Sequence, residues 1–205
     1  MFDINFDNKF KKPIIGIDEV GRGSWAGPVV AGAALLNFEE PLNKNLNDSK
    51  KLSSKTRLEV FESLKKTTQF GIFASSNNEI DKFGIQKATF KAMERAIKIL
   101  KQKIGKQKIA TLLIDGSQKP YFKDLFAVDI RLIVKGDTIS PSIAAASIIA
   151  KCSRDLYMLK MDEVYKGYGF GTNMGYGTKL HKDKLFTSGP TQLHRMTFAP
   201  MKHIL

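Results

Sequence analysis

Short apolar runs that lead into acidic residues constrain the fold of this 205-residue chain more than any other feature. Each run is β-branched, and the first is bounded by Pro13 before it and glycines after it, as expected of a buried strand. Three such runs occur: Ile14-Ile15-Gly16-Ile17 leads into Asp18 and Glu19, residues 109–114 lead into Asp115, and residues 130–134 lead, after Lys135-Gly136, into Asp137. Strands separated by helical patterns predict a mixed α/β sheet.

The rest of the chain supplies further strands and helices. We predict strands over 28–36 and 69–75, a helix that starts with a capping box at Thr56 to Glu59, helices over 86–100 and 142–161, and a glycine-rich loop over 167–177. The strand over 28–36 should pair back on the first strand. No repeat or linker is visible, so we expect one domain over residues 1–205, with about 165–205 as a helical C-terminal extension packed on it.

The acids after the strands could serve phosphoryl-transfer chemistry. If the strands over 14–17 and 109–114 are parallel neighbours, Asp18 and Asp115 lie side by side, which is unfavourable without a compensating cation. Oxygen ligands suit Mg²⁺ or Mn²⁺, and two such ions about 3.5–4 Å apart hydrolyse phosphodiesters. A single aspartate after a strand is more often a solvated loop residue or a helix cap. From the residues alone both interpretations stay open.

The charge of the chain favours polyanionic partners. Its 33 basic and 20 acidic residues give a net charge of +13, which attracts nucleic acid, although solvated lysine faces would give the same number. The single cysteine, Cys152, excludes an internal disulfide and fits a reducing compartment. No apolar run reaches the roughly 18 residues of a membrane span, and the acidic start of the chain argues against a secretory signal. We therefore expect a cytoplasmic protein without a membrane partner.

Three segments have side chains suited to nucleic acid. Gly21-Arg22-Gly23 lets the backbone approach a ligand and offers an arginine to a phosphate. Ser49, Lys50 and Lys51 stand in a short loop before a helix. Tyr176 lies between two glycines and close to lysines, which suits stacking. Each segment alone is equally compatible with an ordinary turn, capping loop or packed aromatic.

Other reactive residues give no separate signal. His181, His194 and His203 lack the spacing of metal ligands, so we predict no zinc site. Cys152 lies on an alanine-rich helix face and is expected to pack rather than to react.

Taken together, the motifs resemble bacterial ribonuclease HII, the type 2 ribonuclease H family. They follow the family order over nearly the whole chain: Gly16 to Gly23 with Ala26 to Val30, Asp48 to Ser53, Asp115-Gly116, Lys135 to Asp137, Ser142 to Lys151 with Arg154-Asp155, Gly175 to Lys179 with His181, and His194-Arg195 with Phe198 to Pro200.

The resemblance implies a ribonuclease H-like fold, a five-stranded mixed sheet flanked by helices. It also implies a catalytic, metal-binding quartet of Asp18, Glu19, Asp115 and Asp137 that holds two Mn²⁺ or Mg²⁺ ions. Gly21, Arg22 and Gly23 would grip the ribonucleotide 2′-hydroxyl and its phosphate, and Tyr176 would stack on the sugar at an RNA–DNA junction. The expected activity is cleavage of RNA–DNA hybrids, and cleavage 5′ of single ribonucleotides in duplex DNA, by a monomer.

Ser24-Trp25 departs from the family pattern, in which Pro-Leu is common, close to Gly21 to Gly23. Three alternatives remain at this point. Type 3 ribonuclease H would need an additional N-terminal substrate-binding domain, another ribonuclease H-like nuclease would lack the pairing of Gly-Arg-Gly with Tyr176, and a non-catalytic basic binding protein would not explain acids after successive strands.

Overall fold

The computed structural model describes residues 3–122 and 128–203, so residues 1–2, 123–127 and 204–205 of the expected domain lie outside it. Its sheet has the strand order β3-β2-β1-β4-β5. The strands are β1 (Ile14–Val20), β2 (Val29–Leu36), β3 (Thr68–Ser75), β4 (Thr111–Asp115) and β5 (Asp129–Ile133). β1 pairs antiparallel with β2, as predicted, and parallel with β4, which meets the condition under which Asp18 and Asp115 are neighbours; β1 is the central strand.

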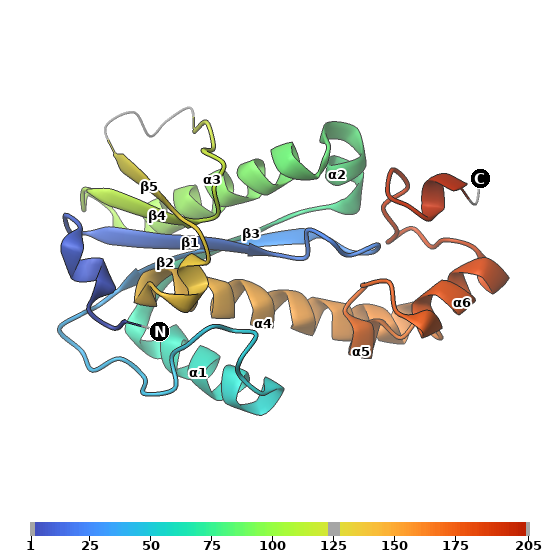
Figure 1. Ribbon diagram of the computed structural model, residues 1–205, viewed down its shortest axis with the longest axis horizontal. Coiled ribbons are helices and arrows are strands. Elements are labelled where there is room, and N and C mark those ends of the chain that lie inside the picture. The colour runs from blue at the N-terminus through green and yellow to red at the C-terminus, as the bar shows by residue number, and fades with distance from the viewer. Residues whose placement is uncertain (1–2, 123–127, 204–205) are drawn as a thin grey trace.

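Helices cover both faces of this sheet (Figure 1). They are α1 (Ser54–Thr67), α2 (Asn77–Phe83), α3 (Ile85–Ile104), α4 (Pro141–Val164), α5 (Phe170–Asn173) and α6 (Lys179–Ser188), with short 3₁₀ turns η1 (Phe6–Lys9), η2 (Gly136–Thr138) and η3 (Met201–His203). One core joins α3 to Ile15 and Ile17 of β1, and a second joins α1 and α4 to the other side of β2. The predicted α/β fold, a five-stranded mixed sheet flanked by helices, is confirmed.

Gly16 allows α4 to lie directly on the central strand. A Cβ at Gly16 would overlap the backbone carbonyl of Ser142 at the start of α4. Since successive strand residues point to opposite faces, Gly16 and Asp18 share the face that α4 covers, whereas Ile15 and Ile17 face α3. The close approach of α4 therefore sets the surroundings of Asp18.

Gly16→Ala should destabilise the fold by about 2 to 3 kcal/mol, because the added methyl must push a helix backbone away from the sheet. Urea unfolding followed by circular dichroism would measure this loss. Gly16→Ala combined with Ser142→Gly should be no more stable, because the overlap is with backbone atoms rather than with the Ser142 side chain. A Gly16→Ala protein as stable as the wild type would contradict this account of helix packing.

Local corrections concern where elements begin and end. The capping box predicted at Thr56 is wrong: α1 begins three residues earlier, and its N-cap is Ser53, whose hydroxyl accepts from the Thr56 N–H at 3.1 Å. A capping box does occur at Ser76, where it starts the unpredicted helix α2. The loop predicted over 167–177 contains the short helix α5.

Candidate active site

The four predicted acids lie on or just beyond the central strands of the sheet. Asp18 and Glu19 belong to β1 itself, which continues to Val20 instead of ending before them. Asp115 is the last residue of the adjacent strand β4, and Asp137 lies in η2, the turn that follows β5. The topology thus brings all four to one region, near the start of α4.

The local electrostatics disfavour ionised carboxylates on β1 and β4. Burial raises the pKa of Asp18 well above its usual value, and the charges of Glu19 and Asp115 raise it further. Burial also raises the pKa of Glu19, with Arg22 opposing and Asp115 adding to the rise. Asp115 follows the same pattern, with burial as the main cause and the charge of Asp137 as a further one. A cation bound among these groups would offset both the burial of the carboxylate charges and their mutual repulsion.

The side chain of Lys50 forms an ion pair with Asp137. The Lys50 Nζ donates to Asp137 Oδ2 at 2.9 Å, and Asp137 is 2% exposed. Burial disfavours the Lys50 charge, but the hydrogen bond and charge of Asp137 outweigh it and raise the pKa of Lys50. Lys50 is therefore next to the acids, and Asp137 is bound to an ammonium group.

The side chains do not all converge. Within residues 3–122 and 128–203, no three acidic, histidine or cysteine side chains are arranged to hold one metal ion as they stand. Asp18 faces α4, where the Ser147 hydroxyl lies beside it, and Asp115 Oδ1 accepts from the Gly136 N–H, whereas Glu19 lines a cavity of about 200 Å³ on the α3 face. Alternation along β1 is the reason: adjacent strand residues point to opposite faces.

The Gly-Arg-Gly segment and Tyr176 lie together. Gly21 has a φ of +89°, which glycine adopts without strain. The Arg22 guanidinium donates to Glu19 Oε1 at 3.2 Å. A Cβ at Gly23 would lie 3.9 Å from a ring carbon of Tyr176, so the ring lies beside the face of Gly23 where a side chain would project.

Two fully buried arginines hold this segment from behind. Arg195 donates to the carbonyls of Gly21 at 2.6 Å, Arg22 at 2.9 Å and Gly27 at 2.9 Å. Arg154 donates to the carbonyls of Pro28, Met174 and Ala26 and to Ser24 Oγ. Within the described residues, neither arginine forms an ion pair with a carboxylate. Their charge is thus compensated by backbone dipoles, which fixes the carbonyls of the segment inward.

The departure at Ser24-Trp25 has a structural role. Ser24 is buried, and its hydroxyl donates to the Gly21 carbonyl at 2.9 Å while it accepts from Arg154 at 2.7 Å. The Trp25 N–H donates to the Gly175 carbonyl at 2.8 Å, and a Cβ at Gly177 would overlap the indole ring. Both residues therefore tie the Gly21–Gly23 segment to the Tyr176 loop.

Other predicted residues take different positions. Ser49 is 3% exposed and its hydroxyl lies 3.0 Å from Ser147 Oγ, so it faces the acids rather than solvent. Lys51 is exposed. Cys152 packs in the core, and burial raises the pKa of its thiol to about 11, as expected of a structural cysteine. Asp155, from the predicted Arg154-Asp155 motif, forms ion pairs with Arg57 and Lys151.

Sequence reasoning did not assign roles to Ser147 or the two buried arginines. For Arg154 a signal existed, because spacings of four place it on the same helix face as Ala150 and Met158. For Arg195 no local pattern predicts burial, since its partners lie more than 160 residues earlier in the chain.

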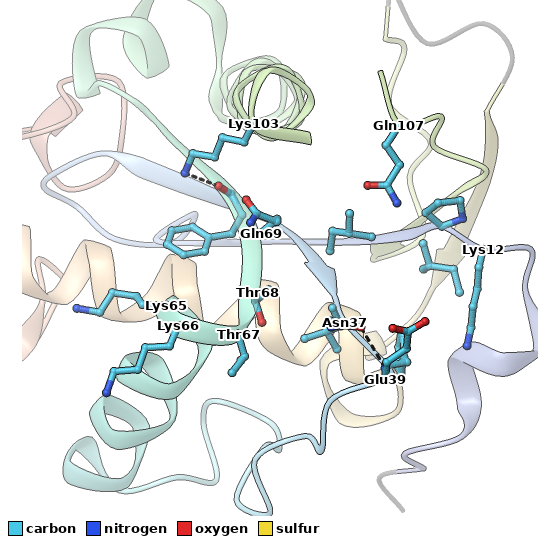
Figure 2. Close-up of a pocket in the computed structure, with 16 residues that line it drawn as sticks. Lys12, Asn37, Glu39, Lys65, Lys66, Thr67, Thr68, Gln69, Lys103 and Gln107 are labelled. Carbon is cyan, nitrogen blue, oxygen red and sulfur yellow. Dashed lines mark hydrogen bonds between the residues drawn. The ribbon is translucent and has the colours of Figure 1, made fainter. Parts of the chain in front are cut away.

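A larger cavity lies away from these acids (Figure 2). It has a volume of about 730 Å³, and Lys12, Thr68 and Lys103 are among its lining residues. Because Ile14 at the start of β1 also lines it, the cavity is at the opposite end of the strand from Asp18. The Lys103 Nζ there donates to the Phe70 carbonyl at 2.8 Å.

None of the helices in the described residues is long and apolar enough to span a bilayer.

Comparison with known proteins identifies the family and the fold of the chain. The family model described as Ribonuclease HII matches residues 15–201. A Ribonuclease HII of Halorhodospira halophila is 41% identical over 193 residues, which is 94% of each chain. The ribonuclease H2 of Pyrococcus horikoshii has a TM-score of 0.75 at 22% identity, over 93% of this chain and 96% of the other. Bst-RNase HIII in complex with Mn²⁺ has a TM-score of 0.76 at 21% identity, and the match covers 93% of this chain and 68% of the other.

The fold places the chain in the ribonuclease H-like class of α/β proteins. Within that class, the chain belongs to the ribonuclease HII family. It is accordingly a ribonuclease H, a nuclease that hydrolyses phosphodiester bonds, and the alternative of a non-catalytic basic binding protein is set aside.

Proposed function

We propose that this ribonuclease cleaves RNA–DNA hybrids and also cuts duplex DNA on the 5′ side of a single embedded ribonucleotide, leaving a 3′-hydroxyl and a 5′-phosphate. It acts as a monomer in the cytoplasm, and residues 1–205 form one catalytic domain with about 165–205 packed on it. The observation that carries the substrate assignment is the Tyr176 ring beside Gly23, next to the strand that holds the acids.

Two divalent ions, Mn²⁺ or Mg²⁺, are the proposed cofactors. Asp18, Glu19, Asp115 and Asp137 would hold them, with Asp18 as the bridging ligand because it lies on the central strand beside β4. The donor set fits: it consists of carboxylate oxygens, and three of the four carboxyl groups have raised pKa values that a cation would lower. When bound, such ions activate the attacking water and stabilise the leaving oxygen. The Mn²⁺ of Bst-RNase HIII supports the same choice of metal.

The chain's own residues orient the substrate. With the carbonyls of Gly21 and Arg22 turned inward onto Arg195, the opposite side of this segment is free to contact a 2′-hydroxyl and a phosphate. Arg22 is exposed and offers its guanidinium to that phosphate, while Lys50 and Lys51 add positive charge from the loop before α1. Ser49 supports the acids through Ser147. Tyr176, 38% exposed, presents its ring to the sugar beside the ribonucleotide.

The direct test is cleavage of a DNA duplex that carries one ribonucleotide, with Mg²⁺, Mn²⁺ or EDTA and with mapping of the product ends. An all-DNA duplex and a longer RNA–DNA hybrid run alongside. Cutting only 5′ of the ribonucleotide, and only with metal, is the expected result. If the enzyme cut the long hybrid but left the single ribonucleotide intact, the assignment of Gly21 to Gly23 and Tyr176 would be wrong.

Tyr176→Ala should reduce cleavage at a single ribonucleotide by about 10- to 100-fold, because stacking on an aromatic ring is worth about 1–3 kcal/mol. Binding of the long hybrid should change less, since phosphate contacts dominate it. Single-turnover cleavage and filter binding would measure the two effects. Tyr157→Ala is the matched control, because Tyr157 has the same exposed fraction of 38%. It should leave cleavage at the single ribonucleotide and binding of the long hybrid within about twofold of wild type. Equal losses of cleavage and binding in Tyr176→Ala would remove its junction-reading role.

A further inference from the structure

Two buried histidines, His181 and His194, lie next to the loop that carries Tyr176, residues 174–178 between α5 and α6. His181 of α6 is 0% exposed and His194, from the segment after α6, is 1% exposed. Their Nε2 atoms lie 3.0 Å apart. The rings of Trp25, Tyr168 and Phe170 surround His181 with centroid distances of 5.2 to 6.2 Å. Burial lowers the pKa of His181, and burial together with the charge of His181 lowers the pKa of His194 to about 4. Both shifts favour the neutral form of the rings at pH 7.

The hydrogen bonds fix where each proton sits. The Thr191 N–H donates to His194 Nδ1 at 2.9 Å, so this nitrogen carries the lone pair and the proton of a neutral His194 is on Nε2. That Nε2–H points at His181 Nε2, which must accept. The proton of His181 is then on Nδ1, from where it is donated to the Tyr176 carbonyl at 2.9 Å.

The last acceptor of this chain links it to the substrate-reading residues. The Tyr176 carbonyl also accepts from the Thr178 N–H at 2.9 Å, and the Tyr176 N–H donates to the Asn173 carbonyl at 2.9 Å. The backbone of Tyr176 is thus held at both its polar groups, whereas its ring is exposed beside Gly23.

We propose that His181 and His194 form a one-directional relay of hydrogen bonds, from Thr191 to the Tyr176 carbonyl, that positions the Tyr176 ring for reading a ribonucleotide. His181 is a positioning residue that acts through Tyr176. This role rests on the proposed function of Tyr176, but the protonation pattern of the relay does not.

The pattern can be measured without substrate. Nuclear magnetic resonance of protein with ¹⁵N-labelled histidine, through long-range ¹H–¹⁵N correlations at pH 7, should give the Nε2–H tautomer for His194 and the Nδ1–H tautomer for His181. The exposed His203 provides a reference signal in the same spectrum. An Nε2–H tautomer at His181, or a doubly protonated ring at either position, would overturn the relay.

The positioning role needs a cleavage measurement. His181→Ala removes the donor to Tyr176 and should reduce cleavage at a single ribonucleotide by about tenfold, with cleavage of a long hybrid within about twofold of wild type. His181→Asn should restore most of the loss, because its amide nitrogen can take the place of Nδ1. Equal loss on both substrates, or no recovery with asparagine, would overturn the positioning role. Failure of the wild-type enzyme at the single ribonucleotide would instead refute the proposed function and leave the tautomer result standing.

Discussion

Asp18→Asn is expected to remove cleavage almost completely and at the same time to raise the melting temperature. Activity should fall at least about a thousandfold, equivalent to about 4 kcal/mol of transition-state stabilisation, because the proposed bridging carboxylate is lost. Stability should rise because the pKa of Asp18 is higher in the folded chain than in the unfolded one. Such a carboxyl stabilises the fold only while protonated, so above its ordinary value near 4 its ionisation costs folding free energy. Asparagine keeps the shape without the charge.

Single-turnover cleavage and thermal unfolding, each with EDTA and with Mn²⁺, would measure both effects. Wild-type protein should gain thermal stability from Mn²⁺, whereas Asp18→Asn should gain little, since a ligand stabilises only the state that binds it. Asp155→Asn is the control: it should keep its activity and lose stability, because Asp155 holds Arg57 and Lys151. An Asp18→Asn enzyme with normal turnover, or one that melts below wild type, would contradict the assignment.

Arg195→Ala should destabilise the protein by about 3 to 5 kcal/mol. The substitution leaves the carbonyls of Arg22 and Gly27 without their donor, removes one of the two donors to the Gly21 carbonyl, and opens a void where a fully buried side chain was. Each unsatisfied buried carbonyl costs about 1–3 kcal/mol, partly relieved by relaxation. Guanidinium-chloride unfolding measured by fluorescence would give the loss.

Arg195→Lys should recover only part of this loss, because an ammonium group cannot match the planar fork that reaches three carbonyls. Arg131→Ala, which removes an exposed arginine paired with Asp129, should change stability by no more than about 0.5 kcal/mol. If Arg195→Ala cost no more than Arg131→Ala, the inward carbonyls of the Gly21–Gly23 segment would not depend on Arg195.

Much of the fold could be predicted because the central strands carry local signals. The β-branched run at Ile14 to Ile17 and the one before Asp115 are buried strands, as predicted, whereas their parallel pairing was considered only as a condition. The position at which β1 ends could not be predicted from the sequence. Asp18 and Glu19 look like loop residues by composition, yet both continue the ladder opposite Gly32 and Ala31. Strand length here depends on the partner strand, which composition alone does not reveal.

The same point limits prediction of the site. Motif order predicts four acids for the site, but it does not predict that β1 runs through Asp18 and Glu19, which turns their side chains to opposite faces of the sheet. The pairing of Lys50 with Asp137 joins residues 87 positions apart. Arg154 lay on a predictable helix face, but a charge without an acidic partner is an unusual core residue. Its partners are three backbone carbonyls and the Ser24 hydroxyl, and since every residue has a carbonyl, no sequence pattern indicates which ones accept.

The grip of Arg195 on Gly21 also has a consequence for the order in which the enzyme becomes competent during synthesis. A growing polypeptide makes the acids of β1 early, but the segment beside them can acquire its final shape only once residue 195 has left the ribosome. A partly made chain therefore contains the acids of β1 before the backbone of the neighbouring Gly21–Gly23 segment is fixed, so Arg195, near the end of the sequence, completes a structure that the first strand begins.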